Sequence, residues 1–247
     1  MNTIYIRNIS IDKDLDEESY YSHIPAISYV EKEGLYFKKP VTFFIGENGT
    51  GKSTLLEAIA TYCGFAPEGG SRNFSFSTRD THSDLYEHLM IAKTGYPKDG
   101  FFLRAESFYN VASYIEDVDY DGLLTKNSYG GKSLHKRSHG ESFLALVKNR
   151  FRGKGLYLLD EPEAALSPTR LMELLIHIHD LVEDDSQFII STHSAILMTY
   201  PDADIFEFSD TGIRKMRYDQ SDHYKITKSF IDRPEIMYRH LFGEDEK

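Results

Sequence analysis

The sequence predicts an α/β fold in which a mainly parallel sheet is flanked by helices. Three strand-sized apolar runs, Val41–Ile45, Gly155–Leu159 and Gln187–Ser191, alternate along the chain with segments of helical character. Strands that are apolar throughout are typical of parallel sheets covered on both faces. The first run is followed directly by glycine, the second by two acidic residues, and the third by threonine and histidine. Because ligands bind at the carboxyl ends of such strands, the sequence predicts a ligand site at this edge of the sheet.

The other segments predict the layers around this sheet. Alternating apolar residues over Thr3–Ile11 indicate an edge strand, and Ile205–Phe208 with Ile213–Arg217 indicates a hairpin. Short strands are expected at Leu35–Lys38 and Gly100–Leu103, and the N-terminal strands are expected to be antiparallel. Helices are expected over Lys52–Tyr62, Ser83–Thr94, Glu141–Phe151, Thr169–Leu181, Ala195–Met198 and Ile226–Leu241. We expect one domain over residues 1–247, with a small helical insertion at about residues 104–152.

Composition limits the class of protein. The 247 residues are 40% hydrophobic, which is enough for one substantial core, and no apolar run approaches the roughly 20 residues of a membrane helix. The single cysteine, Cys63, cannot form an internal disulfide and is expected in the core. No signal peptide is evident, so we expect a cytoplasmic protein without an integral membrane segment.

The net charge of −11 argues against nonspecific binding of nucleic acid by the whole surface. A local basic cluster is the exception, and a solvated helix C-terminus explains it better than a nucleic-acid site does. The cluster consists of Lys148, Arg150, Arg152 and Lys154.

A glycine-rich segment directly follows the strand Val41–Ile45 and precedes a helix. Its glycines permit positive φ and bring backbone N–H groups close to phosphate oxygens, while the helix N-terminus adds partial positive charge. Lys52 can reach the β- and γ-phosphates, and the hydroxyl of Ser53 suits Mg²⁺. We therefore predict an ATP-binding phosphate loop. Its residues are Gly46, Glu47, Asn48, Gly49, Thr50, Gly51, Lys52, Ser53 and Thr54.

Two carboxylates end the apolar strand Gly155–Leu159. Asp160 is placed to hold the Mg²⁺ shell, and Glu161 is placed to polarise the attacking water as general base. Acids at a strand end can also cap the next helix. Two together after an apolar strand, in a chain with a phosphate loop, favour the catalytic interpretation.

Further motifs resemble those of ABC-type ATPases. Asp160–Pro168 (DEPEAALSP) resembles the Walker B motif and D-loop, and Ser138–Ser142 (SHGES) resembles the signature motif, in the form seen in chromosome-maintenance and DNA-repair members. The signature begins 22 residues before Asp160, as this superfamily expects. Ser191–Ser194 (STHS) resembles the segment that carries the switch histidine, here His193. The resemblance covers residues 41–198 and implies an ABC-type P-loop NTPase fold.

The resemblance also implies how the site is completed. Ser138, Gly140 and Glu141 would bind the γ-phosphate of ATP held by an opposite subunit, so a homodimer with two ATP at its interface is expected. His193 would contact the γ-phosphate, which makes Lys52, Glu161 and His193 the candidate catalytic residues.

The chain departs from the superfamily where a glutamine is expected to contact Mg²⁺. Arg104-Ala105-Glu106-Ser107 follows the strand Gly100–Leu103 instead. We expect Glu106 to join Ser53 and Asp160 around Mg²⁺, and the alternative is a buried ion pair between Glu106 and Arg104. Ser167 stands where transporters carry aspartate at the end of the D-loop. The aromatic that stacks on adenine stays open among Tyr20, Tyr21, Tyr29 and Tyr36.

The length of the insertion narrows the type of ATPase. Lys52 and Asp160 are 108 residues apart, which leaves no room for the coiled-coil arms of chromosome-maintenance proteins. Two segments, Phe101–Asn110 (FFLRAESFYN) and Ser191–Asp204 (STHSAILMTYPDAD), closely resemble those of compact stand-alone bacterial ATPases. The chain is also similar to the ATPase half of overcoming-lysogenization-defect proteins. This implies a conformational switch in a soluble protein or DNA partner system, in DNA metabolism or phage defence. The alternatives are the ATPase subunit of a membrane transporter and a phosphotransferase, although the latter leaves Ser138–Ser142 and His193 unexplained.

Overall fold

The computed structural model describes residues 3–12, 15–72, 83–108, 110–113 and 138–243. A six-stranded sheet with the order β5-β6-β7-β3-β8-β9 forms its centre. All neighbouring strands are parallel except β8 and β9, which form an antiparallel hairpin. These findings confirm the mainly parallel sheet and the hairpin. The strands are β3 (Val41–Gly46), β5 (Asp99–Arg104), β6 (Gly155–Asp160), β7 (Gln187–Ser191), β8 (Asp204–Ser209) and β9 (Gly212–Met216).

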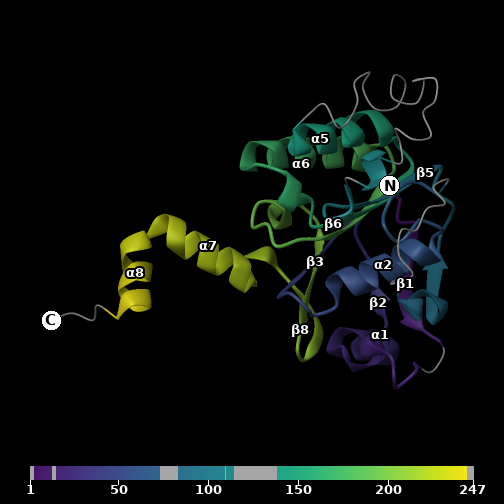
Figure 1. Cartoon of the computed structure of the whole chain (residues 1–247), viewed down its shortest axis with the longest axis horizontal. Coiled ribbons are helices and arrows are strands. Elements are labelled where there is room, and N and C mark those ends of the chain that lie inside the picture. The colour runs from purple at the N-terminus through teal and green to yellow at the C-terminus, as the bar shows by residue number, and fades with distance from the viewer. Residues whose placement is uncertain (1–2, 13–14, 73–82, 109, 114–137, 244–247) are drawn as a thin grey trace.

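Helices cover both faces of this sheet (Figure 1). Successive residues of a strand point to opposite faces, so Phe43 packs in one core and Phe44 in the other. The first core contains apolar side chains of α5 (His139–Arg150) and α6 (Pro168–Glu183). The second contains those of α1 (Pro25–Glu33) and α2 (Lys52–Tyr62), as well as the buried Cys63. Burial on both faces explains why these strands are apolar throughout.

A second sheet has three antiparallel strands in the order β2-β1-β4, namely β2 (Leu35–Tyr36), β1 (Ile6–Ile11) and β4 (Leu89–Lys93). The side chain of Gln187 joins it to β7, because its amide accepts from Ile6 N at 2.8 Å and donates to Ile6 O at 3.0 Å. Two expectations were wrong here. The strand β1 is central rather than at an edge, and residues 83–94 form the short 3-10 helix η2 (Asp84–Glu87) followed by β4 instead of a helix. Leu89 and Ile91 alternate with exposed residues, and pairing with β1 satisfies the backbone.

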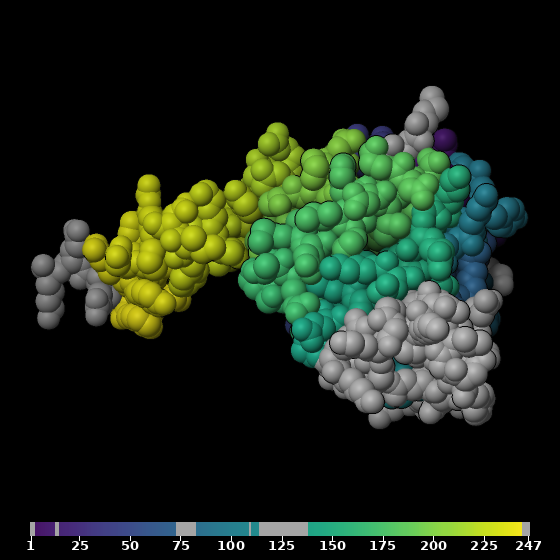
Figure 2. Space-filling view, turned by 90° about the horizontal axis from the view of Figure 1, so that it is seen from above, coloured from purple at the N-terminus to yellow at the C-terminus, as the bar shows by residue number. Residues whose placement is uncertain are grey.

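The remaining elements are short 3-10 helices and a C-terminal arm. The expected helix at Ala195–Met198 is the 3-10 helix η5 (Leu197–Thr199), and the expected tail helix is divided at Arg233, before Pro234, which cannot continue a helix. Its two parts, α7 (Asp222–Asp232) and α8 (Pro234–Phe242), project from the body (Figures 1 and 2). The other 3-10 helices are η1 (Tyr20–His23), η4 (Pro162–Ala165) and η6 (Tyr218–Gln220).

Part of the expected helical insertion, residues 114–137 with position 109, lies outside the described residues. The basic cluster at the end of α5 makes structural contacts, since Arg150 pairs with Asp99 at 2.7 Å and Lys148 lies 3.6 Å from Glu173. Across the described ranges, no helix combines the length and the apolar character that crossing a membrane requires.

Candidate functional site

The phosphate loop connects β3 to α2 at the carboxyl edge of the sheet. Gly51, the residue before the helix, has φ of 95°, and a Cβ there would lie 2.6 Å from Cγ2 of Ile24. Only glycine fits this conformation and this contact without strain. Glu47, Asn48 and Gly49 form the exposed tip of the loop. The loop therefore presents its backbone to solvent at the edge where the sheet's other polar residues meet.

Lys52 is buried below the loop. Its Nζ donates hydrogen bonds to the carbonyl oxygens of Gly46 and Glu47, each at 2.8 Å. Burial lowers the pKa of Lys52, and the nearby carboxylates of Glu161 and Asp160 oppose this shift. The ammonium is thus held by neutral carbonyls, which it can exchange for phosphate oxygens.

Ser53 and Asp160 meet between the loop and β6. The hydroxyl of Ser53 donates to Oδ1 of Asp160 at 2.9 Å. Burial raises the pKa of Asp160, and Arg104 and Ser53 counter it. These two oxygen donors fit Mg²⁺, which is typically bound by one or two protein oxygens, several waters and substrate phosphates. The described residues contain no cluster of three or more His, Cys, Asp or Glu side chains arranged for a metal.

Glu161 and His193 lie on adjacent strand ends. The strands β6 and β7 pair Asp160 with Ser191, and Glu161 N donates to Ser191 O at 3.0 Å. Glu161 has φ of 49°, a left-handed conformation that costs a non-glycine residue free energy. In this conformation Oε1 of Glu161 lies 3.5 Å from Nε2 of His193. Such outliers cluster at active sites, which supports a functional role for Glu161.

The imidazole of His193 has an unusual environment. Burial and the neighbouring Lys52 lower its pKa below 6.5, while Glu161 opposes the shift, so the environment favours the neutral ring. Its Nε2 atom is buried, and among the described residues it has no hydrogen-bond partner. His193 can therefore form a hydrogen bond with a group that enters beside Lys52 and Glu161.

Two residues near His193 were not predicted from the sequence. Oε1 of Glu163 accepts a hydrogen bond from the backbone N–H of His193, and burial raises the pKa of Glu163. The ring of His223, in α7, meets that of His193 edge-on with 5.1 Å between centroids. Glu163 lies within the Asp160–Pro168 motif, but nothing in the sequence points to His223, which is 30 residues beyond His193.

The signature segment begins α5. Ser138 caps this helix: its Oγ accepts from Glu141 N at 3.4 Å, and its N–H donates to Oε2 of Glu141 at 3.0 Å. Gly140 is buried, and a Cβ there would lie 2.8 Å from the carbonyl oxygen of Ala165, so the segment packs tightly on η4. Ser138 and Glu141 are exposed. The structure thus brings the signature next to the D-loop, and no hydrogen bond between described residues links it to the phosphate loop of its own chain.

Glu106 lies at the same edge but is exposed. The N–H of the preceding Ala105 donates to Asp160 O at 3.1 Å. The alternative, an ion pair between Glu106 and Arg104, was wrong. Arg104 instead lies 2.5 Å from Glu57 and 3.4 Å from Asp160. Arg104 was therefore missed as a neighbour of the proposed Mg²⁺ ligand Asp160.

One of the four candidate adenine-stacking residues has another role. Tyr21 is buried, and its hydroxyl donates to Asp84 at 2.7 Å. Tyr20 and Tyr36 are exposed. Since Ile24 touches Gly51, the turn that carries Tyr20 lies beside the phosphate loop, which favours Tyr20.

Comparisons with known proteins agree with this geometry. The family described as "AAA domain" matches residues 26–119, and the family described as "AAA domain, putative AbiEii toxin, Type IV TA system" matches residues 142–199. Together these matches cover more than half of the chain and include the phosphate loop, the acidic strand end and His193.

Two proteins to which the chain is similar are ATP-binding proteins of import systems by name. The nucleoside import ATP-binding protein NupA of Lactococcus lactis is 22% identical over 180 residues, covering 66% of this chain but only 35% of NupA. The thiamine import ATP-binding protein ThiQ of Histophilus somni is 29% identical over 169 residues, covering 60% of this chain and 74% of ThiQ. The structure of cbiO1 from Clostridium perfringens, part of the ABC transporter complex cbiONQ, shares the fold with a TM-score of 0.52 at 17% identity, covering 97% of this chain and 99% of that one.

The fold and the family matches define an ABC-type P-loop NTPase. The chain has the fold of ABC-type ATPases and matches AAA-domain families over residues 26–119 and 142–199.

Proposed function

We propose that the chain hydrolyses ATP in a composite site formed by two copies of itself. The observation that carries this proposal is the convergence of Lys52, Ser53, Asp160, Glu161 and His193 at one edge of the sheet. A phosphate loop, a carboxylate for the metal shell, a base and a neutral hydrogen-bonding ring are the parts that hydrolysis of a phosphoanhydride requires.

Each residue has a chemical role in the proposal. The ammonium of Lys52 leaves the Gly46 and Glu47 carbonyls and neutralises charge on the β- and γ-phosphates. Glu161 orients a water for attack on the γ-phosphorus and accepts its proton as the bond to the β-phosphate oxygen breaks. The ring of His193 hydrogen-bonds a γ-phosphate oxygen, and its separation of 3.5 Å from Glu161 couples the two.

Mg²⁺ is the expected cofactor. Ser53 and Asp160 would hold the ion and its waters, and Glu106 would reach them from the turn after β5. The ion would supply positive charge to the phosphates, as in other P-loop ATPases. The remaining residues of the phosphate loop, Gly46 to Thr54, would contact the nucleotide through their backbone.

The position of the signature segment supports the proposed homodimer. Ser138 and Glu141 are exposed at the N-terminus of α5, where backbone N–H groups and the helix dipole favour an anion. In the proposal, Ser138, Gly140 and Glu141 complete the γ-phosphate site of the partner copy. The whole chain, residues 1–247, then acts as one ATPase domain whose segment 104–152 carries the signature.

Replacement of Glu161 by Gln tests the proposal. We expect hydrolysis to fall about 10²–10⁴-fold because the general base is lost, while ATP still binds. Phosphate release and nucleotide retention would be measured together with mass by light scattering, where the variant should be a dimer with two ATP. Glu173→Gln on the exposed face of α6 is the matched control and should keep wild-type turnover. Equal turnover in Glu161→Gln and wild type would refute the assignment of the base.

The partner of the switch is proposed to be a soluble protein or DNA. The match to a family described as a toxin of a type IV system supports a role in defence. ATP dependence and the single buried cysteine support a cytoplasmic location. Recovery of a partner from lysate in equal yield with ATP, with ADP and without nucleotide would count against a nucleotide-gated switch.

A transporter subunit is the second candidate, because NupA and ThiQ are named import proteins. Glu106 in place of the expected glutamine and Ser167 in place of aspartate argue against it. Co-purification of a membrane permease with the tagged chain from detergent-solubilised membranes would establish this second candidate.

A further inference from the structure

The C-terminal arm, defined as α7 and α8 (residues 222–242), has no fully buried side chain, although Tyr224 at its base is partly buried. The two helices have 11 and 9 residues, and isolated helices shorter than about 12 residues are marginal in water. The arm nevertheless exposes a series of large apolar side chains. They are Ile226, Ile231, Ile236, Tyr238, Leu241 and Phe242. Helices with this pattern gain their stability when another surface covers the apolar residues.

The base of the arm is firmly attached to the body. Ser221 is fully buried and caps α7, with its Oγ donating to Tyr218 O at 2.8 Å. The ring of Tyr224 packs edge-on against that of Tyr218, with 5.2 Å between centroids. The arm therefore leaves the body in a set direction, away from the sheet (Figure 1).

The same base adjoins the nucleotide site. His223 lies in the first turn of α7, and the centroid of its ring is 5.1 Å from that of His193. A partner surface that covers a γ-phosphate beside His193 would therefore also lie close to the first turn of α7.

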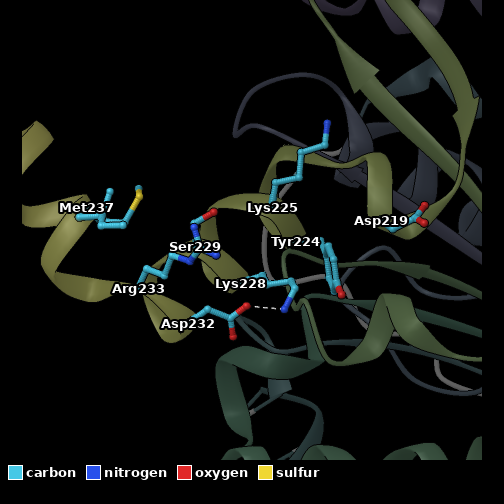
Figure 3. Close-up of a pocket in the computed structure, with 9 residues that line it drawn as sticks. Asp219, Tyr224, Lys225, Lys228, Ser229, Asp232, Arg233 and Met237 are labelled. Atoms are coloured by element: carbon cyan, nitrogen blue, oxygen red, sulfur yellow. Dashed lines mark hydrogen bonds and ion pairs between the residues drawn. The ribbon is translucent and has the colours of Figure 1, made fainter.

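A hollow of about 520 Å³ lies between η6, α7 and α8 (Figure 3). Three cations, Lys225, Lys228 and Arg233, line it together with two carboxylates and the apolar Tyr224, Ile236 and Met237. One carboxylate, that of Asp232, is paired with Lys228. Lys225 also lies 3.8 Å from Asp222, so the hollow combines apolar contact with cations that are partly paired.

We propose that this arm docks on a second copy of the chain, next to the composite nucleotide site. The inference rests on the proposed function, because the partner copy is what that function brings to His193. Charge supports the same occupant: the arm has four basic and three acidic side chains, whereas the whole chain has a net charge of −11. An acidic surface on the body of the partner copy is attracted to the arm's one excess positive charge.

Substitution of Ile231 by Ser tests the inference in the full-length Glu161→Gln protein with ATP. Ile231 is 76% exposed, so the change removes apolar surface without opening a cavity. The matched control is Ile176→Ser on α6, which is 59% exposed. Sedimentation measures the dissociation constant of the ATP-bound dimer, which should rise about tenfold or more for Ile231→Ser and remain unchanged for Ile176→Ser. Amide hydrogen exchange in the arm should also slow when ATP is added to the parent protein.

The outcomes separate the two proposals. A parent that stays monomeric with ATP refutes the composite site and the docking of the arm together. A parent that dimerises equally well with Ser at position 231, or whose arm exchange ignores ATP, overturns the docking and leaves the composite site standing. Binding of a DNA duplex is measured on the same proteins. If the parent binds the duplex and Ile231→Ser does not, while the dimer stays intact, the docking is overturned in favour of a nucleic-acid partner. Equal weakening by both substitutions overturns it as well, because the effect would not be specific to the arm.

Discussion

Arg104 occupies a position that makes it the sharpest test of the site's electrostatics. Its guanidinium lies 2.5 Å from Oε2 of Glu57 and 3.4 Å from Oδ2 of Asp160. The side chains of Arg104, Glu57 and Asp160 are 20%, 17% and 8% exposed, so two carboxylates share one buried cation. Replacement by Met keeps an unbranched chain of similar length and removes only the charge and its donors.

The expected loss of stability follows from burial. Removing one partner of a buried ion pair costs about 3–5 kcal/mol, because the remaining charge is left uncompensated. Since one fifth of Arg104 is exposed, we expect the lower end, about 3 kcal/mol in the free energy of unfolding. The pKa of Asp160 should also rise, because Arg104 is the main group that opposes the effect of burial on it.

Urea unfolding and Mg²⁺ titration of ATP hydrolysis measure the two effects. The control is Arg150→Met, because Arg150 pairs with Asp99 at 2.7 Å and both side chains are similarly buried, at 19% and 14% exposed. The control should lose a comparable free energy of unfolding without a change in the Mg²⁺ concentration for half-maximal rate. For Arg104→Met, we expect that concentration to increase, because a higher pKa of Asp160 lets protons compete more strongly with Mg²⁺ for this carboxylate. A loss below about 1 kcal/mol, the level of an exposed pair, or the same Mg²⁺ requirement in both variants would refute the reasoning.

Two further predictions concern packing and pH. Gly140→Ala should destabilise the protein by about 1–3 kcal/mol, because its Cβ would lie 2.8 Å from Ala165 O. Gly95→Ala, where a Cβ meets nothing within 4 Å, should be neutral in the same urea unfolding. Burial lowers the pKa of His193 below 6.5, so below that pH the folded state binds fewer protons than the unfolded state. This contribution to stability is complete above pH 6.5 and is lost as pH falls from 6.5 through the lower pKa of the folded state. The unfolding free energy of the wild type minus that of His193→Gln should decrease from pH 8 to pH 5. An increase over the same range would contradict this environment of His193.

The sequence carries the phosphate loop and the acidic strand end as local features. Gly46–Ser53 is a continuous strand–loop–helix segment whose glycines and lysine are the residue types that phosphate binding requires, and Asp160 and Glu161 end an apolar strand. Because the two strands are parallel, their carboxyl ends meet at one edge, which makes the proximity of Ser53 and Asp160 predictable in principle. The 2.9 Å hydrogen bond between these residues agrees with that argument.

The local sequence pattern gave a wrong prediction where pairing between distant segments determined the secondary structure. Residues 83–94 carry apolar side chains at spacings that fit a helix, yet Leu89–Lys93 is a strand because β1 offers a free edge for backbone pairing. For the same reason β1 is central and not an edge strand.

The sequence by itself thus determined the class of protein, the parallel sheet and the residues able to handle phosphate, because these features rest on short segments. Only the tertiary structure decided that Arg104 pairs with Glu57 and Asp160 instead of Glu106. It also decided that His223, in α7, lies against His193. Side chains far apart in sequence meet only when helices and strands pack, and no local periodicity records that meeting. The C-terminal arm illustrates the point: its apolar pattern predicts helices, but only the folded chain places their base beside the nucleotide site.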